Sequence, residues 1–316
     1  MKTTLLNSLR KSKKLVIIYS VLAIIAVISA YLSPTFRSMG NISNLLHRAA
    51  PLLMISLGQT LAVLLTGLDL SVGPVASLTT VIAAVTMEAG PASILLGLFL
   101  VLAAGTGFGF VNGVGISKLM IHPLIATLST MAVAEGLALL ILPRPGGYIP
   151  YDFVQLLSAK LGPFSVPFLF FLLSAVLLYL LLHHTSFGRH LYAVGGDEQS
   201  ARVSGLAVDW IKIKAFTLCG LFAAIGGLFL SVRIASGDPT AGSAYTLDSL
   251  TAVLMGGTTF AGGRGGIGGT IAGVFILLLL KNVFNFLGIH TYWQHVFKGL
   301  ILVAAILAYN LQTDGS

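Results

Sequence analysis

Long apolar segments separated by short polar ones dominate the chain. Each segment has about the length of a bilayer-spanning helix or can reach it with flanking residues, and none shows the period-2 alternation of a barrel strand. We therefore place helices at residues 15–32, 49–66, 72–88, 92–116, 121–142, 166–183, 213–235, 248–258, 267–286 and 294–310. The eighth is short, which predicts that it extends into flanking residues or is a broken helix.

The composition agrees with a chain that folds in a bilayer. Hydrophobic residues make up 56% of the 316 positions and charged residues 9%. We expect an all-α polytopic membrane protein with about ten transmembrane helices over residues 15–310, between short ends at 1–14 and 311–316. The lysine-rich amino terminus resembles a signal peptide. Its apolar stretch is longer than a usual signal core and has no convincing cleavage site, so we predict a retained first helix.

Positive charge predicts the orientation of the chain. If the amino terminus is cytoplasmic, alternation assigns four Lys or Arg residues to the outside and eleven to the inside. The eleven are Lys2, Arg10, Lys11, Lys13, Lys14, Lys118, Arg189, Arg202, Lys212, Lys214 and Arg264. Both termini then lie in the cytoplasm, as the positive-inside rule requires. The net charge of +8 does not indicate nucleic acid binding, because the basic residues are scattered among short connections.

A carboxylate interrupts the apolar pattern in GLDLSVG at residues 67–73. Glycines break the helix on both sides, and Asp69 or Ser71 would be suited to cap the following helix. One interpretation is an interhelical turn with such a cap. The other is a direct transport role for Asp69, since ionisable groups inside membranes are functional candidates.

Glycines recur at four-residue spacing in two segments, which predicts close helix packing. The two sets are Gly105, Gly109 and Gly113, and Gly265, Gly269 and Gly273. They fall on the fourth and ninth predicted helices. These helices would be counterparts if the second to fifth and the seventh to tenth helices formed two inverted repeats.

Residues 184–212 form a long polar segment that the topology places inside. Gly195 and Gly196 end one element, Asp197 can cap the next, and residues 198–204 have helix-compatible composition. This pattern predicts a short cytoplasmic helix that is suited to docking, or else an ordinary solvated loop. A second inward turn, at 256–266, is glycine-rich but lacks the G-x-x-x-x-G-K-[ST] pattern, so it does not indicate nucleotide binding.

Several motifs together resemble a known family. They are GLDLSVG at 67–73, HHTSFGRHLYAVGGDEQSARVSGL at 183–206, TLCGLFAAIGG at 217–227, GGTTFAGGRGGIGGTIAG at 256–273 and NVFNFLG at 282–288. Their order and spacing over residues 34–310 resemble the ribose-type monosaccharide permeases of ABC importers.

The resemblance implies a type II importer fold in the bacterial inner membrane. It also implies a second permease copy or paralogue, a periplasmic sugar-binding protein and cytoplasmic ATPase subunits. ATP and Mg would bind to the ATPase, and this chain would hold no cofactor and no metal and would not be an enzyme.

The segment around Gly195 resembles the coupling element that contacts the ATPase in this family. The corresponding residues here are Gly195, Gly196, Asp197, Glu198, Ala201, Arg202, Ser204 and Gly205. Asp197 replaces a more common asparagine and preserves a capping side chain. Glu135 stands where relatives often carry a basic residue, so the family pattern gives no substrate inference for the fifth helix.

The favoured function is passage of a monosaccharide, with a pentose such as ribose as the first candidate. A nucleoside or a signalling furanose remains an alternative substrate. A second class is an ion-coupled secondary transporter that uses Asp69 or Glu135, although it leaves the coupling-like segment unexplained. An intramembrane enzyme has little support, because no paired catalytic groups or metal-ligand spacing occur, and the single Cys219 is most simply a buried apolar residue.

A neutral sugar needs a pathway lined by small and hydroxylated groups rather than by strong charges. Together with Asp69, the candidate pathway residues are Thr127, Thr130, Asn282, Asn285 and Gln294. Packing between helices is at least an equal explanation for each of them.

Overall fold

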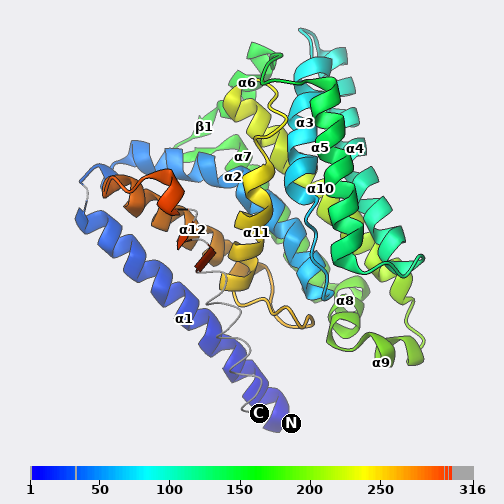
Figure 1. The fold of residues 1–316 in the computed structure, drawn as a ribbon. Coiled ribbons are helices and arrows are strands. Elements are labelled where there is room, and N and C mark those ends of the chain that lie inside the picture. Colours follow the sequence, from blue (N-terminus) through cyan, green and yellow to red (C-terminus); the bar gives the residue numbers. More distant parts are fainter. Residues whose placement is uncertain (1, 33, 295, 298, 301–316) are drawn as a thin grey trace.

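The computed structural model describes residues 2–32, 34–294, 296–297 and 299–300, and these residues are predominantly helical (Figure 1). The longer helices are α1 (Lys2–Leu32), α2 (Met39–Leu64), α3 (Val72–Thr86), α4 (Pro91–Ser117), α5 (Pro123–Ile141), α7 (Val166–His184), α10 (Val208–Ile234), α11 (Ser243–Met255) and α12 (Ile267–Phe286). The shorter elements are η1 (Pro34–Arg37), α6 (Tyr151–Ser158), β1 (Lys160–Leu161), β2 (Phe164–Ser165), α8 (Ser186–Gly196) and α9 (Glu198–Val203).

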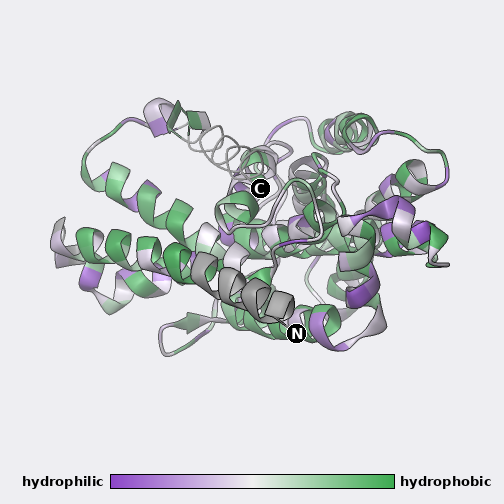
Figure 2. Ribbon diagram, turned by 90° about the horizontal axis from the view of Figure 1, so that it is seen from below, coloured by the Kyte–Doolittle hydropathy of each residue, from purple (hydrophilic) through white to green (hydrophobic). Residues whose placement is uncertain are grey.

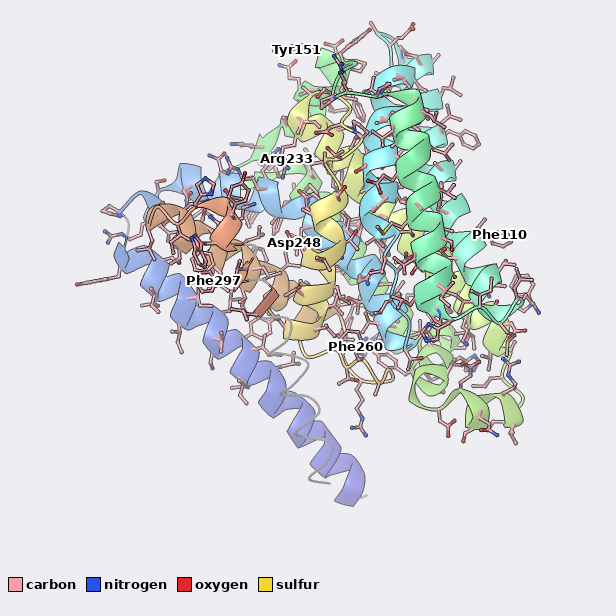
Figure 3. All side chains as sticks on the ribbon, viewed as in Figure 1. Phe110, Tyr151, Arg233, Asp248, Phe260 and Phe297 are labelled. Carbon is pink, nitrogen blue, oxygen red and sulfur yellow. The ribbon has the colours of Figure 1, made fainter. Side chains whose placement is uncertain are left out.

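Five helices among the described residues are long and apolar enough to cross a membrane: α4, α5, α7, α10 and α12. Apolar stretches of 10–17 residues lie at Leu15–Tyr31 and in α3. Hydrophobic colour dominates the long helices in Figure 2, and Phe110 projects from the outer side of α4 in Figure 3, 49% exposed. Apolar residues on an outer face suit contact with lipid. The tenth predicted segment, 294–310, lies largely outside the described residues.

The helices pack in a paired pattern. α2 packs against α10, α10 against α4, and α2 against α12, while α3 contacts α4 as α11 contacts α12. The first turns of α3 and α11 meet, because a Cβ built on Gly73 or Gly242 would overlap the other segment. In Figure 1 the two helices leave this point in opposite directions. This is the pattern expected if α2–α4 and α10–α12 are inverted repeats.

Glycines bring α4 and α10 into backbone contact, as their spacing predicts. A Cβ on Gly109 would overlap the Phe216 carbonyl oxygen, and Gly105 and Gly113 are similarly close to α10. On the α10 side, a Cβ on Gly220 would overlap the Gly105 carbonyl oxygen. The absence of side chains at these positions is what allows such close approach.

The second glycine set packs differently from the first. Gly269 and Gly273 of α12 approach the backbone of Gly256 and Ala252, so they face α11 and not α2. In the inverted-repeat pattern, the counterpart of the α4–α10 contact is the contact between α2 and α12. There the hydroxyl groups of Thr60 and Thr270 form a hydrogen bond at 2.8 Å.

The prediction that Gly265 packs within a helix is wrong. Gly265 precedes α12 and has φ +129°, a value that favours glycine, and a Cβ there would overlap Thr258.

Four predicted boundaries are corrected. α1 begins at Lys2 rather than at residue 15. α2 begins ten residues earlier than expected, with Ser38 as its N-cap. The hydropathy pattern did not reveal this start, because the first turns of the helix are polar and Pro51 lies inside it. α10 begins at Val208 rather than 213. α11 extends toward the amino terminus, as the short eighth span suggested, but ends at Met255.

A small unit between α5 and α7 escaped prediction. It consists of the amphipathic helix α6 and the two-stranded hairpin β1–β2, which lie at the upper end of the molecule in Figure 1. Tyr151 marks this end in Figure 3. Elements of eight and two residues are too short for hydrophobic periodicity to reveal.

Candidate functional site

The broken segment before α3 holds a buried carboxylate. Asp69 is 1% exposed, and its Oδ1 accepts hydrogen bonds from the Ser71 backbone N at 3.0 Å and the Ser71 Oγ at 2.5 Å. This is an Asx turn that shapes the entry to α3. Ser71 itself makes no side-chain cap, so the capping prediction for Ser71 is wrong, because its hydroxyl is used by Asp69.

Two neighbouring helices complete a polar network around Asp69. Asn112 of α4 donates from Nδ2 to Ser71 Oγ at 3.0 Å and to Asp69 Oδ1 at 3.4 Å. Thr130 of α5 donates to Asn112 Oδ1 at 2.6 Å. Thr127, one turn earlier, donates to the Leu68 carbonyl at 3.0 Å. The structure therefore brings together three of the predicted pathway residues.

Asn112 is a member of this network that sequence reasoning did not select, and Ser71 was selected only as a possible helix cap. Asn112 lies within the long apolar segment of α4, and this amide at a buried helix face was a signal that could have identified it.

We expect Asn112→Ala to lower the free energy of unfolding by about 1–3 kcal/mol, because it leaves Asp69 and Thr130 short of a partner in a buried site. Thermal denaturation in detergent measures the change. Asn44→Ala, at an exposed position of α2, is the matched control and should have little effect. Equal stability of the two variants would show that the network does not stabilise the fold.

The remaining predicted pathway residues form a separate group. Gln294 donates to Asn285 Oδ1 and to the Ile289 carbonyl, both at 3.0 Å, within the local chain that follows α12. Asn282 lies on α12 nearby and is half-buried. Figure 1 places α5 and α12 on opposite sides of α11, so the structure does not join these residues to the Asp69 network.

Polar contacts also cross the meeting point of α3 and α11. The Gly242 backbone N donates to Ser77 Oγ at 2.8 Å, and the Asp238 backbone N donates to Thr80 Oγ1 at 3.0 Å. Irregular backbone within a membrane-spanning bundle must be satisfied by protein groups or must line a cavity. Here α3 supplies partners to the segment before α11, and Thr246 of α11 donates to the Leu70 carbonyl oxygen before α3 at 3.4 Å.

The short helix predicted at residues 198–204 exists as α9, one residue shorter than expected. Asp197 caps it by accepting from the Ser200 backbone N at 3.0 Å. An additional helix, α8, precedes it with Thr185 as its cap. The two form an elbow at the lower end of the bundle in Figure 1, the same end as the first residues of α1.

A chain of ion pairs holds α9 against the bundle. Lys118 at the end of α4 and Arg202 of α9 both contact Asp209 of α10 at 3.0 Å. Glu198 pairs with Lys212 at 2.6 Å and with Arg202 at 3.3 Å. Burial opposes the charged form of Glu198, but the hydrogen bonds and charges of Lys212 and Arg202 outweigh it and lower the pKa of this carboxyl group.

Ala201 has a different position from the one that its predicted docking role requires. It is 5% exposed and packs into the hydrophobic core. Val203 of the same helix is 84% exposed, and Gln199 and Arg202 are also exposed. Together with the exposed Ser200, these three residues form the outer surface of α9, while Ala201 anchors the helix.

Among the described residues, no group of three or more His, Cys, Asp or Glu side chains is arranged to hold a metal ion. The site thus consists of buried hydroxyls, amides and one carboxylate, at broken helices within an apolar bundle, together with a charged helix at one end. These features define a polytopic membrane protein with a polar interior. The chain belongs to the family described as branched-chain amino acid transport system / permease component, which matches residues 41–306.

Relatives with printed functions extend over nearly the whole chain. The ribose import permease protein of Bacillus subtilis (strain 168) is 38% identical over 289 residues, which are 90% of this chain and 89% of the relative. The ribose import permease protein of Escherichia coli (strain K12) is 36% identical over 300 residues, 92% of each chain. The D-allose transport system permease protein of Escherichia coli (strain K12) is 32% identical over 290 residues, 91% and 89% of the chains. No solved structure matches the chain.

Proposed function

We propose that this chain is the membrane-spanning subunit of an ATP-driven sugar importer, with ribose as the favoured substrate. The similarity to ribose import permeases over 92% of both chains carries the proposal. The polar, largely uncharged interior supports it, because hydroxyls and amides can exchange hydrogen bonds with a neutral sugar. The relative named for allose makes a hexose the alternative substrate.

The mechanism divides the work among several subunits. A periplasmic binding protein delivers the sugar, and a second permease copy or a paralogue completes the pathway. Cytoplasmic ATPase subunits bind ATP and Mg and drive the alternation between inward and outward states. The chain itself is not an enzyme in this scheme and sits in the inner membrane with both termini in the cytoplasm.

The α9 end is the proposed ATPase contact. The surface is a capped helix that ion pairs connect to α10, with Gln199, Arg202 and Val203 outward. Gly195, Gly196, Asp197, Glu198 and Ser204 shape and fix this elbow, and Gly205 reverses the chain with φ +80°. A rigid helix transmits an applied displacement to the helices on either side of it.

Reconstitution tests the proposed function. The permease, its ATPase and its binding protein are placed in proteoliposomes, and uptake of labelled ribose and allose is measured with and without ATP. ATP-dependent ribose uptake is expected, and the permease alone should neither hydrolyse ATP nor accumulate sugar. Uptake that needs an ion gradient but no ATPase would overturn the proposal in favour of a secondary transporter.

The pathway proposal keeps Asp69, Thr127 and Thr130 as one group and Asn282, Asn285 and Gln294 as another. The first group is the better supported, because Thr130 is only half-buried and belongs to a network that joins α4, α5 and the broken segment. Rearrangement of that network would offer the same hydrogen-bonding groups to a passing sugar.

Thr130→Phe is expected to lower uptake about tenfold, equivalent to about 1.4 kcal/mol on the transport barrier, because the ring would narrow the path. Thr130→Val replaces the hydroxyl with a methyl group of similar size. Its uptake therefore shows the effect of losing the hydrogen bond to Asn112 without the added bulk of the ring. Assembly is checked by co-purification, and Thr106→Phe on α4 is the control for added bulk. Normal uptake by the Thr130→Phe variant would remove Thr130 from the pathway.

A further inference from the structure

Three backbone segments meet beside the α8–α9 elbow. They are the end of α2, the end of α8 at Gly195 and Gly196, and the turn at 256–266 that joins α11 to α12. The Gly263 backbone N donates to the Leu64 carbonyl oxygen at 2.9 Å, which fixes the turn to α2. Phe260 marks this turn at the lower end of Figure 3, and Figure 1 shows the turn next to α8.

The contacts at this point leave no room for side chains. A Cβ on Gly195 would overlap the Leu64 carbonyl oxygen. A Cβ on Gly262 would lie 2.5 Å from the Gly195 carbonyl oxygen, and one on Gly263 would lie 2.7 Å from Gly196 Cα. Gly262 and Gly263 also have φ of +72° and +63°, a region that favours glycine. The three segments are thus in direct backbone contact.

A partly buried tyrosine adds a specific bond across the same contact. The Tyr192 hydroxyl of α8 donates to the Gly265 carbonyl oxygen at 3.1 Å. Burial raises the pKa of Tyr192 to about 12, so the hydroxyl keeps its proton and remains a donor.

The turn is internally fixed as well. The Thr259 backbone N donates to the Arg264 carbonyl at 3.0 Å, and the Gly266 backbone N donates to Thr258 Oγ1 at 3.3 Å. A displacement of α8 would therefore move the turn as a body.

Each segment continues into a different part of the bundle. α2 leads within five residues to Asp69 and its network, and the turn leads to α11 on one side and α12 on the other. We propose that Tyr192, Gly195, Gly262 and Gly263 form a junction of positioning residues that passes the motion of α9 to α2 and to the α11–α12 pair. The proposal rests on the proposed function, because it takes α9 as the ATPase contact.

The physical basis is the stiffness of the contact. Close-packed backbone does not yield as a flexible side chain does, so a push on one segment reaches the others with little loss. By contrast, α9 is attached to α10 by two partly exposed ion pairs, Arg202 with Asp209 and Glu198 with Lys212, and by the packing of the small Ala201 side chain. The junction is therefore the firmer of the two routes from the elbow into the bundle.

The test measures the amount of sugar transported per ATP hydrolysed by the complete complex in proteoliposomes. Tyr192→Phe removes the bond to Gly265, and Gly195→Ala forces the segments apart. Both complexes are expected to assemble and to hydrolyse ATP, with the ratio reduced at least about threefold, or roughly 0.7 kcal/mol.

Two matched controls lie on α1 and at the start of α12. Tyr19→Phe removes a comparable bond, from a phenol to the Gly268 carbonyl oxygen at 3.0 Å, away from the junction. Gly268→Ala adds a Cβ that would lie 4.0 Å from the Tyr19 hydroxyl oxygen. Both should keep the wild-type ratio.

An unchanged ratio for a folded Tyr192→Phe complex, or an equal fall for Tyr19→Phe, would overturn the junction. If Gly195→Ala fails to fold, Tyr192→Phe decides alone. Failure of the unmodified complex to couple ATP to uptake would instead contradict the proposed function, so the two failures are distinguishable.

Discussion

Replacing Gly109 with leucine is expected to abolish the folded permease. α4 and α10 touch through backbone at this point, and even a Cβ would overlap the Phe216 carbonyl oxygen and lie 3.0 Å from Thr217 Cα. Overpacking by a few methylenes in a tight core costs about 1–3 kcal/mol, and separating two helix backbones also loosens the contacts at Gly105 and Gly113. The yield of monodisperse protein and its Tm in detergent measure the effect.

Gly107→Leu is the matched control for this change. Gly107 lies on the same helix two residues away, and a Cβ there meets no atom of the described residues within 4 Å. This variant should fold with nearly the Tm of the unmodified protein. Similar yields of the two variants would contradict the packing role of Gly109.

Val203→Asp is expected to disconnect the permease from its ATPase without unfolding it. Val203 is 84% exposed on the outer surface of α9, so its replacement removes no internal contact. Placing a carboxylate at the centre of a protein interface costs about 2–4 kcal/mol. The lower end of that range corresponds to about a 30-fold rise in Kd. ATP-driven uptake should fall accordingly, and co-purification of the ATPase should be lost.

Val203→Leu provides the control, because it keeps an apolar group at the same place. A cysteine at Val203 should also form a cross-link with the ATPase in an active complex, which one at Ala201 should not, since Ala201 is buried. Full uptake by Val203→Asp would show that the ATPase does not dock here, and periplasmic labelling of this cysteine would reverse the topology.

Hydrophobic segments predicted most of the helices, because a bilayer requires long runs of apolar residues to be helical. Nine of the ten predicted segments fall on helices among the described residues. The errors have a common cause. α2 and α10 begin within polar sequence, and α6 and α8 are short amphipathic helices that a hydropathy pattern does not separate from loops.

The candidate site was predicted in part. Asp69, Thr127 and Thr130 were selected as polar residues in apolar surroundings, and they lie in one network. Asn282, Asn285 and Gln294 were selected by the same rule and lie elsewhere. Polarity indicates that a buried residue needs a partner, but it does not say which helix supplies that partner.

The sequence by itself determined the membrane class, the positions of most helices, the capped helix after Asp197 and the family. Each of these follows from local pattern, since hydropathy, capping and motif order are properties of neighbouring residues. Only the tertiary structure decided that Asn112 completes the Asp69 network, that Ala201 faces inward while Val203 faces outward, and that Gly265 belongs to a turn. It also brought Gly195 and Gly263 to the end of α2. These contacts join residues far apart in the chain, and the crossing of helices sets them rather than local propensity.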